Sequence, residues 1–248
     1  MRDAAFDASE SVEALGQIPI RECGEPLVDF REAGPRVVWL KEHVVFRYQR
    51  ATVARVGLIQ RLRKAADSLP RGMTIQIVEG WRDRHIQRRM WLWACQRTRR
   101  EHPDWDEARV VEYTNQFSAP YDHNVPPPHV TGGAVDLRFA DAEGVPLDVT
   151  SPFGELNPEP APFDAEGLTE TARANRALMK ATLEAVGITN YAREFWHWSY
   201  GDSGWAYRGR HPCALYGETR PDGWALAPED AADGPLPTLD DSASDASE

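Results

Sequence analysis

Cysteine is scarce in this sequence. The chain of 248 residues contains three, Cys23, Cys95 and Cys213, which are widely spaced and form no C-x-x-C pair. Their odd number and wide spacing argue against a disulfide framework and against a thiolate zinc site. A reducing compartment suits such side chains. A chain of this length can bury a hydrophobic core without cross-links.

Long apolar runs are also lacking. No stretch approaches the roughly 18 apolar residues that a membrane-spanning helix needs. Residues 1–17 have neither a basic beginning nor an apolar run, so they do not look like a signal peptide. The sequence therefore predicts a cytoplasmic protein with no membrane partner.

Positive charge is in deficit. The 28 Lys and Arg residues are outnumbered by 39 Asp and Glu residues, which gives a formal net charge of -11 at pH 7. Such a chain repels phosphate backbones, so binding to nucleic acid would need a concentrated basic face. The one candidate is the arginine run at 82–100, whose helical spacing favours a solvated helix face. We expect no nucleic-acid partner, and the sequence leaves the oligomeric state open.

The remaining composition, with 42% hydrophobic and 27% charged residues, is typical of a globular protein. Residues 1–17 are acidic and small, and residues 220–248 are rich in Pro, Ala, Ser, Asp and Glu. Both ends are predicted to be disordered acidic segments. We therefore expect one folded domain over residues 18–219.

Hydrophobic periodicity predicts where the helices and strands lie. Apolar residues recur every three or four positions in segments that begin near Ala51, Asp83 and Thr169, which indicates three amphipathic helices, with a further short helix at 106–117. Alternating or β-branched segments predict strands at 74–78 and 133–139, a hairpin over 37–48, and a closing meander at 188–191, 195–200 and 205–208.

The stretch PPPHVTGGAVDLRF, residues 126–139, contains the first candidate metal ligands. Zn²⁺ accepts imidazole nitrogen and carboxylate oxygen, which His129 and Asp136 offer. The glycines at 132 and 133 allow the sharp turn that would bring the two together. Viewed alone, the same stretch fits a surface-loop histidine and a solvated edge aspartate equally well.

A second stretch, REFWHWSYGD at residues 193–202, contains Glu194 and His197. Two residues three positions apart point to opposite faces of a regular strand. If both serve one site, the chain must bulge between them or Glu194 must precede the strand. The alternative is a sheet core built from the neighbouring aromatic residues, with His197 as a hydrogen-bonded filler.

Together these residues match a known pattern. H-x-x-G-x-A-x-D from His129 to Asp136, followed by E-x-x-H-W from Glu194, resembles the D-alanyl-D-alanine metallopeptidases, most closely the dipeptidases of the vancomycin-resistance type. The segment E-G-W-R at 79–82, with Gln87 downstream, is similar to the family's D-G-Y-R segment and its following Gln. The resemblance covers residues 18–216.

The resemblance implies that His129, Asp136 and His197 hold one zinc ion, that Glu194 is the general base and that Arg82 stabilises the transition state. Each role has a physical reason. Zinc lowers the pKa of its bound water to about 7, and a carboxylate within reach can move that proton to the leaving amine. A fixed guanidinium meets the negative charge that develops on the carbonyl oxygen, and arginine is always protonated.

Two positions depart from the pattern of the dipeptidases. Pro127 stands where the family usually has serine, and Gly154 stands where it tends to have an aspartate that grips the substrate ammonium group. Loss of that carboxylate removes a charge-assisted hydrogen bond of roughly 1.5–3 kcal/mol. Glu155 is a candidate replacement.

The other five histidines have no partner at metal-ligand spacing, so the sequence assigns them no role: His43, His85, His102, His123 and His211. The tryptophans at 91 and 93 favour packing over ligand binding.

The expected fold is α+β: a mostly antiparallel sheet with the helices packed on one side and the zinc site on the open face, beneath a long loop at 141–162. The expected function is zinc-dependent hydrolysis of a small dipeptide or related amide, as in a D-alanyl-D-alanine dipeptidase. Three alternatives remain at this point. They are a specialised amide hydrolase of a biosynthetic pathway on the same zinc site, a non-haem Fe(II) oxygenase, and a zinc-binding module without turnover.

Overall fold

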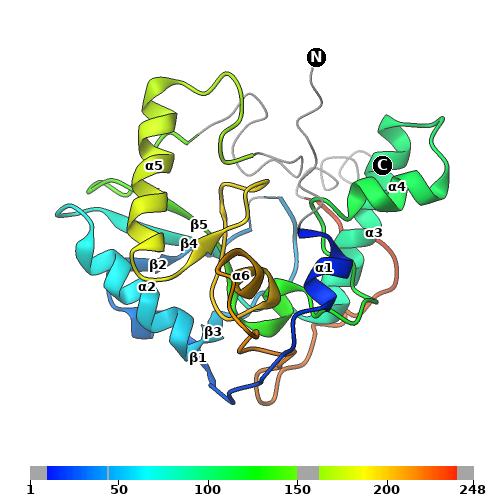
Figure 1. Cartoon of the computed structure of the whole chain (residues 1–248), viewed down its shortest axis with the longest axis horizontal. Coiled ribbons are helices and arrows are strands. Elements are labelled where there is room, and N and C mark those ends of the chain that lie inside the picture. The colour runs from blue at the N-terminus through cyan, green and yellow to red at the C-terminus, as the bar shows by residue number, and fades with distance from the viewer. Residues whose placement is uncertain (1–9, 44, 150–161, 239–248) are drawn as a thin grey trace.

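The computed structural model describes residues 10–43, 45–149 and 162–238. Six α-helices, seven strands and two short 3₁₀ helices follow one another along this part of the chain (Figure 1). In chain order they are α1 (Val12–Gly16), β1 (Leu27–Asp29), η2 (Phe30–Ala33), β2 (Val37–Trp39), β3 (Val53–Arg55), α2 (Val56–Ser68), β4 (Thr74–Glu79), α3 (Arg84–Glu101), α4 (Glu107–Thr114), η3 (Pro128–Thr131), β5 (Ala134–Ala140), α5 (Glu170–Glu184), β6 (Thr189–Asn190), β7 (His197–Ser199) and α6 (Ser203–Arg208).

Two sheets organise the described residues into a mixed α+β fold. The larger has five strands in the order β2-β4-β5-β7-β6, and the smaller pairs β1 with β3. Within the larger sheet β2 and β4 run parallel, while the pairs β4–β5, β5–β7 and β6–β7 run antiparallel. The central strands β4 and β5 therefore each pair with a neighbour on both sides. Strand β5 contains Asp136, one of the candidate site residues.

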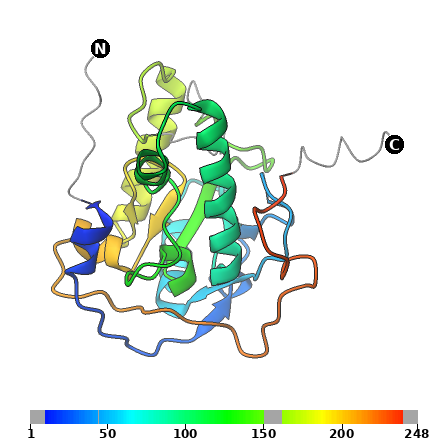
Figure 2. The same cartoon turned by 90° about the vertical axis from the view of Figure 1, so that its right-hand side faces the viewer.

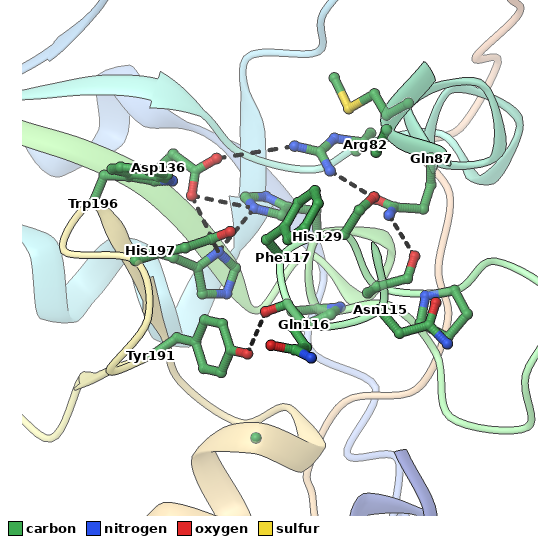
Figure 3. Close-up of a pocket in the computed structure, with 18 of the residues that line it drawn as sticks. Arg82, Gln87, Asn115, Gln116, Phe117, His129, Asp136, Tyr191, Trp196 and His197 are labelled. Atoms are coloured by element: carbon green, nitrogen blue, oxygen red, sulfur yellow. Dashed lines mark hydrogen bonds and ion pairs between the residues drawn. The ribbon is translucent and has the colours of Figure 1, made fainter. Parts of the chain in front are cut away.

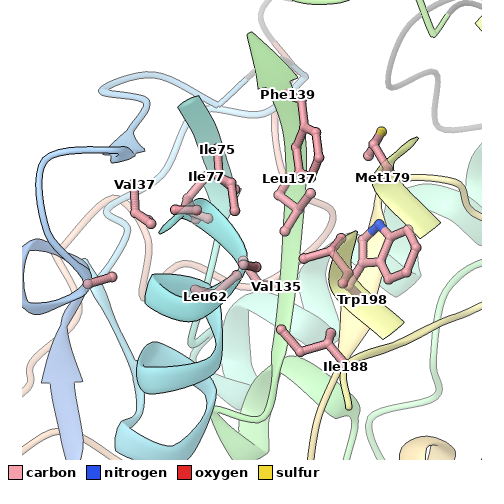
Figure 4. Packing of buried hydrophobic residues seen from close by; sticks show 14 of the residues in the cluster. Val37, Leu62, Ile75, Ile77, Val135, Leu137, Phe139, Met179, Ile188 and Trp198 are labelled. Carbon is pink, nitrogen blue, oxygen red and sulfur yellow. The ribbon is translucent and has the colours of Figure 1, made fainter. Parts of the chain in front are cut away.

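Strand β5 shows how the sequence divides the sheet into two faces. Successive side chains of a strand point to opposite sides, so Val135, Leu137 and Phe139 share one face. All three are fully buried. They pack with side chains of α2 and α5, such as Leu62 and Met179, in the main hydrophobic cluster (Figure 4). The intervening residues, Asp136 among them, face the other way.

The predicted packing of helices on one side of the sheet holds for α2 and α5 but not for α3 and α4. Figures 1 and 2 show α2 and α5 on one side and α3 and α4 on the other. Helix α3 begins where the sequence predicted, because the Asp83 side chain accepts a hydrogen bond from the His85 N–H as an N-cap. The face of the sheet that carries Asp136 is therefore bordered by α3 and α4 rather than left fully open (Figures 1 and 2).

Some predicted elements differ in type. The described residues of 37–48, which leave out residue 44, form no hairpin, because β2 pairs parallel with β4 and Leu40 N–H donates to Ile77 C=O over 2.9 Å. The helix expected from Ala51 begins at Val56, since residues 53–55 pair with β1. Residues 205–208 belong to helix α6 instead of a strand, because Asp202 caps its N-terminus by accepting from the Trp205 N–H.

Residues 10–17 and 220–238, which the sequence placed in disordered segments, contact the rest of the described structure. Helix α1 lies in the first of these segments and contacts α6. In the second, the buried Arg89 guanidinium donates to the carbonyl oxygens of Glu229, Asp230, Gly234 and Pro235. The expected boundaries at 18 and 219 therefore cut through packed segments.

The predicted long loop at 141–162 is described only as far as residue 149 and from residue 162. Gly154 and Glu155 lie outside the described residues. Among the described helices, none is long and apolar enough to cross a membrane.

Candidate metal centre

The three residues expected to bind metal come together on the face of the larger sheet that lies opposite Val135, Leu137 and Phe139. Asp136 on β5 and His197 on β7 are directly paired across the two antiparallel strands. His129 reaches them from η3, which ends at Gly132 with φ +72, a left-handed conformation that favours glycine. At Gly133 a Cβ atom would lie 2.6 Å from the Tyr200 carbonyl oxygen, so only glycine lets β5 start so close to the chain after β7.

The distances among the three side chains fit one metal ion. His129 Nε2 and His197 Nδ1 are 3.2 Å apart, and they lie 3.4 and 3.1 Å from Asp136 Oδ1 (Figure 3). Bonds of 2.0–2.1 Å at tetrahedral angles place neighbouring ligand atoms about 3.4 Å apart. The donor set of two imidazoles and one carboxylate is also that of a catalytic zinc site, which uses three protein ligands. These residues could hold a single Zn²⁺ ion.

The orientation of His129 is fixed from behind. Its Nδ1 lies 2.8 Å from the Gly80 carbonyl oxygen, which can only accept a hydrogen bond. Nδ1 therefore donates this hydrogen bond, and Nε2 faces Asp136 and His197. A backbone carbonyl in this position is a common support for a metal-binding histidine.

Asp136 is charged and buried. Burial alone would raise the pKa of this carboxyl group, but the neighbouring His129 and His197 outweigh that effect and lower its pKa below the usual range. The side chain therefore stays a carboxylate, the form that binds metal.

Glu194 reaches the same centre because it precedes the strand, one of the two arrangements that its spacing from His197 required. A turn joins them, with His197 N–H donating to Glu194 C=O over 3.1 Å. Asn190 Nδ2 also donates to that carbonyl over 2.9 Å and fixes the turn. The Glu194 carboxylate then lies 3.9 Å from His197 Nδ1. Burial, reinforced by Asp136, raises the pKa of Glu194 to about 8.

Arg82 follows β4 and lies on the opposite side of Asp136 from the histidines. Its Nη2 is 2.8 Å from Glu79 Oε2. The same Nη2 is 3.9 Å from Asp136 Oδ2, and Nη1 donates to Gln87 Oε1 over 2.7 Å (Figure 3). The side chain is largely buried and held at two atoms. A guanidinium fixed in this way keeps its direction without rearranging during a reaction.

The sequence did not identify what holds Arg82. Glu79 is completely buried and takes hydrogen bonds from the Tyr48 hydroxyl and from Arg82, with His43 Nε2 at 3.3 Å. His43 Nδ1 accepts from the backbone N–H of Val45 and Phe46, so its proton is on Nε2 and points at Glu79. Burial would raise the pKa of Glu79, but Arg82 and His43 lower it below the usual range. His43, to which the sequence assigned no role, is thus part of the support of the site.

The reactive groups line one cavity of about 220 Å³. One wall is the segment 115–120, which is tied down by hydrogen bonds from Trp91, Tyr191 and Gln87 to residues of that segment. Trp93, which the sequence assigned to packing, and residues of both α1 and α6 also line it. None of the described residues of 141–162 does, so in the described structure the wall comes from 115–120.

This fold and cluster of side chains define a mixed α+β protein with a candidate metal centre equipped for hydrolytic chemistry. Comparison with known families is more specific. Residues 40–216 match the model of peptidase family M15 described as D-ala-D-ala dipeptidase. The chain belongs to this family of peptidases, which confirms the resemblance identified from the motifs.

Two further proteins are similar to this chain. A D-alanyl-D-alanine dipeptidase of Synechocystis sp. is 29% identical over 230 residues, which cover 79% of this chain and 90% of the relative. Among solved structures, VanYB in complex with D-alanine-D-alanine aligns with 68% of this chain and 86% of its own, at 13% identity and a TM-score of 0.40.

Proposed function

We propose that the protein is a zinc-dependent dipeptidase that hydrolyses D-alanyl-D-alanine or a closely related dipeptide. The observation that carries this proposal is the meeting of a His/Asp/His cluster with Glu194 and Arg82 in one cavity. The family to which the chain belongs and the name of the Synechocystis relative support the substrate class. The expected products are two free amino acids.

The roles of the three ligands follow from their chemistry. His129, Asp136 and His197 would hold Zn²⁺, which when bound acts as a Lewis acid and makes hydroxide available near neutral pH. Two imidazoles and one carboxylate are the three protein ligands that a catalytic zinc site uses.

Glu194 supplies the acid–base step. Its carboxylate takes a proton from the attacking water and returns it to the nitrogen of the leaving amino acid. The raised pKa makes the carboxylate a stronger base toward the proton of the attacking water. A positive ion nearby lowers the pKa of a carboxyl group, which keeps the side chain ionised and able to accept that proton.

Arg82 supplies electrostatic stabilisation. Attack on the peptide carbonyl places negative charge on its oxygen, and a guanidinium already held by Glu79 and Gln87 meets that charge without losing further side-chain freedom. The presence of both Glu194 and Arg82 favours a hydrolase over the other two classes that the sequence left open, since neither an Fe(II) oxygenase nor a structural zinc site needs them.

The test compares wild type with Glu194→Gln. We expect about one zinc per chain in both proteins and release of D-alanine from D-alanyl-D-alanine by wild type. Removing the general base should lower kcat by about 10²–10⁴-fold while leaving the zinc content unchanged. Metal content is measured by elemental analysis and D-alanine by a coupled oxidase assay.

Glu184→Gln is the matched control, because Glu184 is an exposed residue of α5 far from the cluster and undergoes the same chemical change. A Glu194→Gln variant as active as this control would remove the general-base assignment. Stoichiometric iron with oxygen consumption would instead favour the oxygenase. A wild type that hydrolyses none of a panel of D,D-, L,D- and L,L-dipeptides and biosynthetic amides would favour the zinc-binding module.

A further inference from the structure

One end of the cavity is apolar. Beside Arg82 its walls come from β4, from residues 45–46 and above all from one face of α3. The lining residues of this apolar subsite are Val45, Phe46, Val78, Met90, Trp93 and Ala94, of which Val45, Phe46, Met90 and Trp93 also pack in one hydrophobic cluster.

The length of the subsite follows from the geometry of α3. Gln87, which donates to the Ala119 carbonyl and accepts from Arg82, marks the end nearest the reactive groups. Met90 and Ala94 follow it three and seven positions later and line the same cavity. At 1.5 Å per residue, Ala94 lies about 10 Å along the helix from Gln87. The methyl group of an alanine substrate reaches only a small part of that distance.

Polar groups beside the subsite are already engaged. The Asn115 side-chain oxygen accepts from the Trp91 indole N–H over 2.8 Å, and the Gln87 amide is bonded at both ends. His43 points its Nε2–H at Glu79. A ligand group placed here therefore finds apolar contacts, and a charged group would lose its hydration without a matched partner.

Space of this kind is costly in a protein unless something fills it. Interiors are packed to the density of organic crystals, and apolar voids remain few and small. An apolar hollow continuous with a reaction centre is the usual form of a side-chain binding pocket. The small residue at Ala94 keeps the far end open, since a larger side chain at this buried position on α3 would occupy it.

We propose that this subsite binds a substrate side chain larger than methyl, so that the preferred substrate is a dipeptide with one bulky aliphatic or aromatic residue. This inference rests on the proposed function, because it concerns the selectivity of the same hydrolytic centre. In a hydrophobic pocket each well-placed methylene changes kcat/KM by about 10-fold or more. We therefore expect at least about 10-fold selectivity over D-alanyl-D-alanine.

The experiment measures kcat/KM of the zinc-loaded full chain for D-Ala-D-Ala, D-Ala-D-Leu, D-Leu-D-Ala, D-Ala-D-Phe and D-Phe-D-Ala. We expect one of the bulky dipeptides to exceed D-Ala-D-Ala by about 10-fold or more. Ala94→Leu, which fills the far end of the subsite, should then lower the ratio of the two kcat/KM values by about 10-fold. The ratio is independent of how much of the variant is folded and active.

Gln96→Leu is the control, because it adds the same side chain to the exposed side of α3 and should leave the ratio unchanged. A preference for D-Ala-D-Ala in wild type, or an Ala94→Leu ratio equal to that of wild type, would overturn the inference while the hydrolase stands. If Ala94→Leu unfolds, Ala94→Val fills less of the subsite and should also lower the ratio of the two kcat/KM values.

Binding separates failure of the inference from failure of the proposed function. The Glu194→Gln variant retains the cavity, and calorimetry gives its affinity for the same five dipeptides. Tighter binding of a bulky dipeptide by about 10-fold, lost in the double variant with Ala94→Leu, supports the subsite even without turnover. Equal affinities for all five would overturn it.

Discussion

The two faces of the five-stranded sheet are built by adjacent residues of the same strands and obey different rules. On one face Val135, Leu137 and Phe139 pack against α2 and α5 with no polar contact needed. On the other, Asp136 between them is bonded to His197 and surrounded by His129 and Arg82. The period of two along a strand separates a core from a reactive site within a single segment.

The difference lies in what each face requires of its neighbours. A core position needs the right volume, so similar apolar side chains can replace one another with small losses. A position on the site face needs particular atoms at particular distances, because each buried polar group depends on its partner. Mutations on the two faces should therefore separate stability from activity.

The largest effect is expected from Asp136→Asn on the site face. The amide has nearly the same volume but no charge, so zinc binding should be lost and turnover should fall by about 10³-fold or more, the several kcal/mol that a catalytic metal supplies. The metal-free variant should still unfold cooperatively, near the midpoint of wild type from which the metal has been removed. Elemental analysis, D-alanine release and thermal melting measure these quantities. Tight zinc binding by this variant would contradict the assignment of Asp136 as a ligand.

The next effect is expected from Leu137→Ala, one residue further along β5. Removing a fully buried leucine leaves a cavity and should lower the free energy of unfolding by about 2–5 kcal/mol. Zinc content and kcat of the folded fraction should match wild type, as measured by urea unfolding and by assay well below the melting midpoint. A loss of kcat larger than the loss of folded protein would show that the two faces are coupled.

A smaller effect is expected from Glu79→Gln, which tests the support of the site. The change removes the charge that holds Arg82 and leaves its guanidinium less well directed. Losing a fixed donor costs about 10²–10³-fold in kcat, so misdirecting one should cost about 10–100-fold. Zinc content should not change.

Tyr48→Phe is the comparison for this prediction, because it removes one hydrogen bond to Glu79 and keeps the charge. It should lower kcat less than Glu79→Gln does. An equal or larger loss in Tyr48→Phe would mean that the Glu79 charge is not what positions Arg82.

The local parts of the fold could be predicted from the sequence. The strand at 74–78, the strand at 133–139 and the helices from Asp83 and Thr169 agree with β4, β5, α3 and α5. Their periodic apolar patterns and N-caps are contained within each segment. The proposed ligands could also be predicted from the sequence, because each motif is short. In the second motif Glu194 and His197 lie within one turn of chain.

Long-range contacts could not be read from the same patterns. The expected strand at 205–208 is helix α6, in which Trp205 and Ala206 pack in one cluster with Ile18, a residue far away in the sequence. The polar, proline-rich segment at 220–238 has the composition of a disordered tail. In the structure, however, the Arg89 guanidinium on α3 donates hydrogen bonds to its backbone carbonyl oxygens. Each of these outcomes depends on a partner that composition does not reveal.

The sequence by itself determined the chemical groups of the site and the alternation that puts Asp136 opposite the core, since both depend on residue type and on the fixed geometry of a strand. Only the tertiary structure decided that Glu79, Tyr48 and His43 would support Arg82, and that α3 would border an apolar hollow beside it. Those arrangements join segments that are tens of residues apart, and their stability comes from burial and matched partners that exist only once the chain has folded.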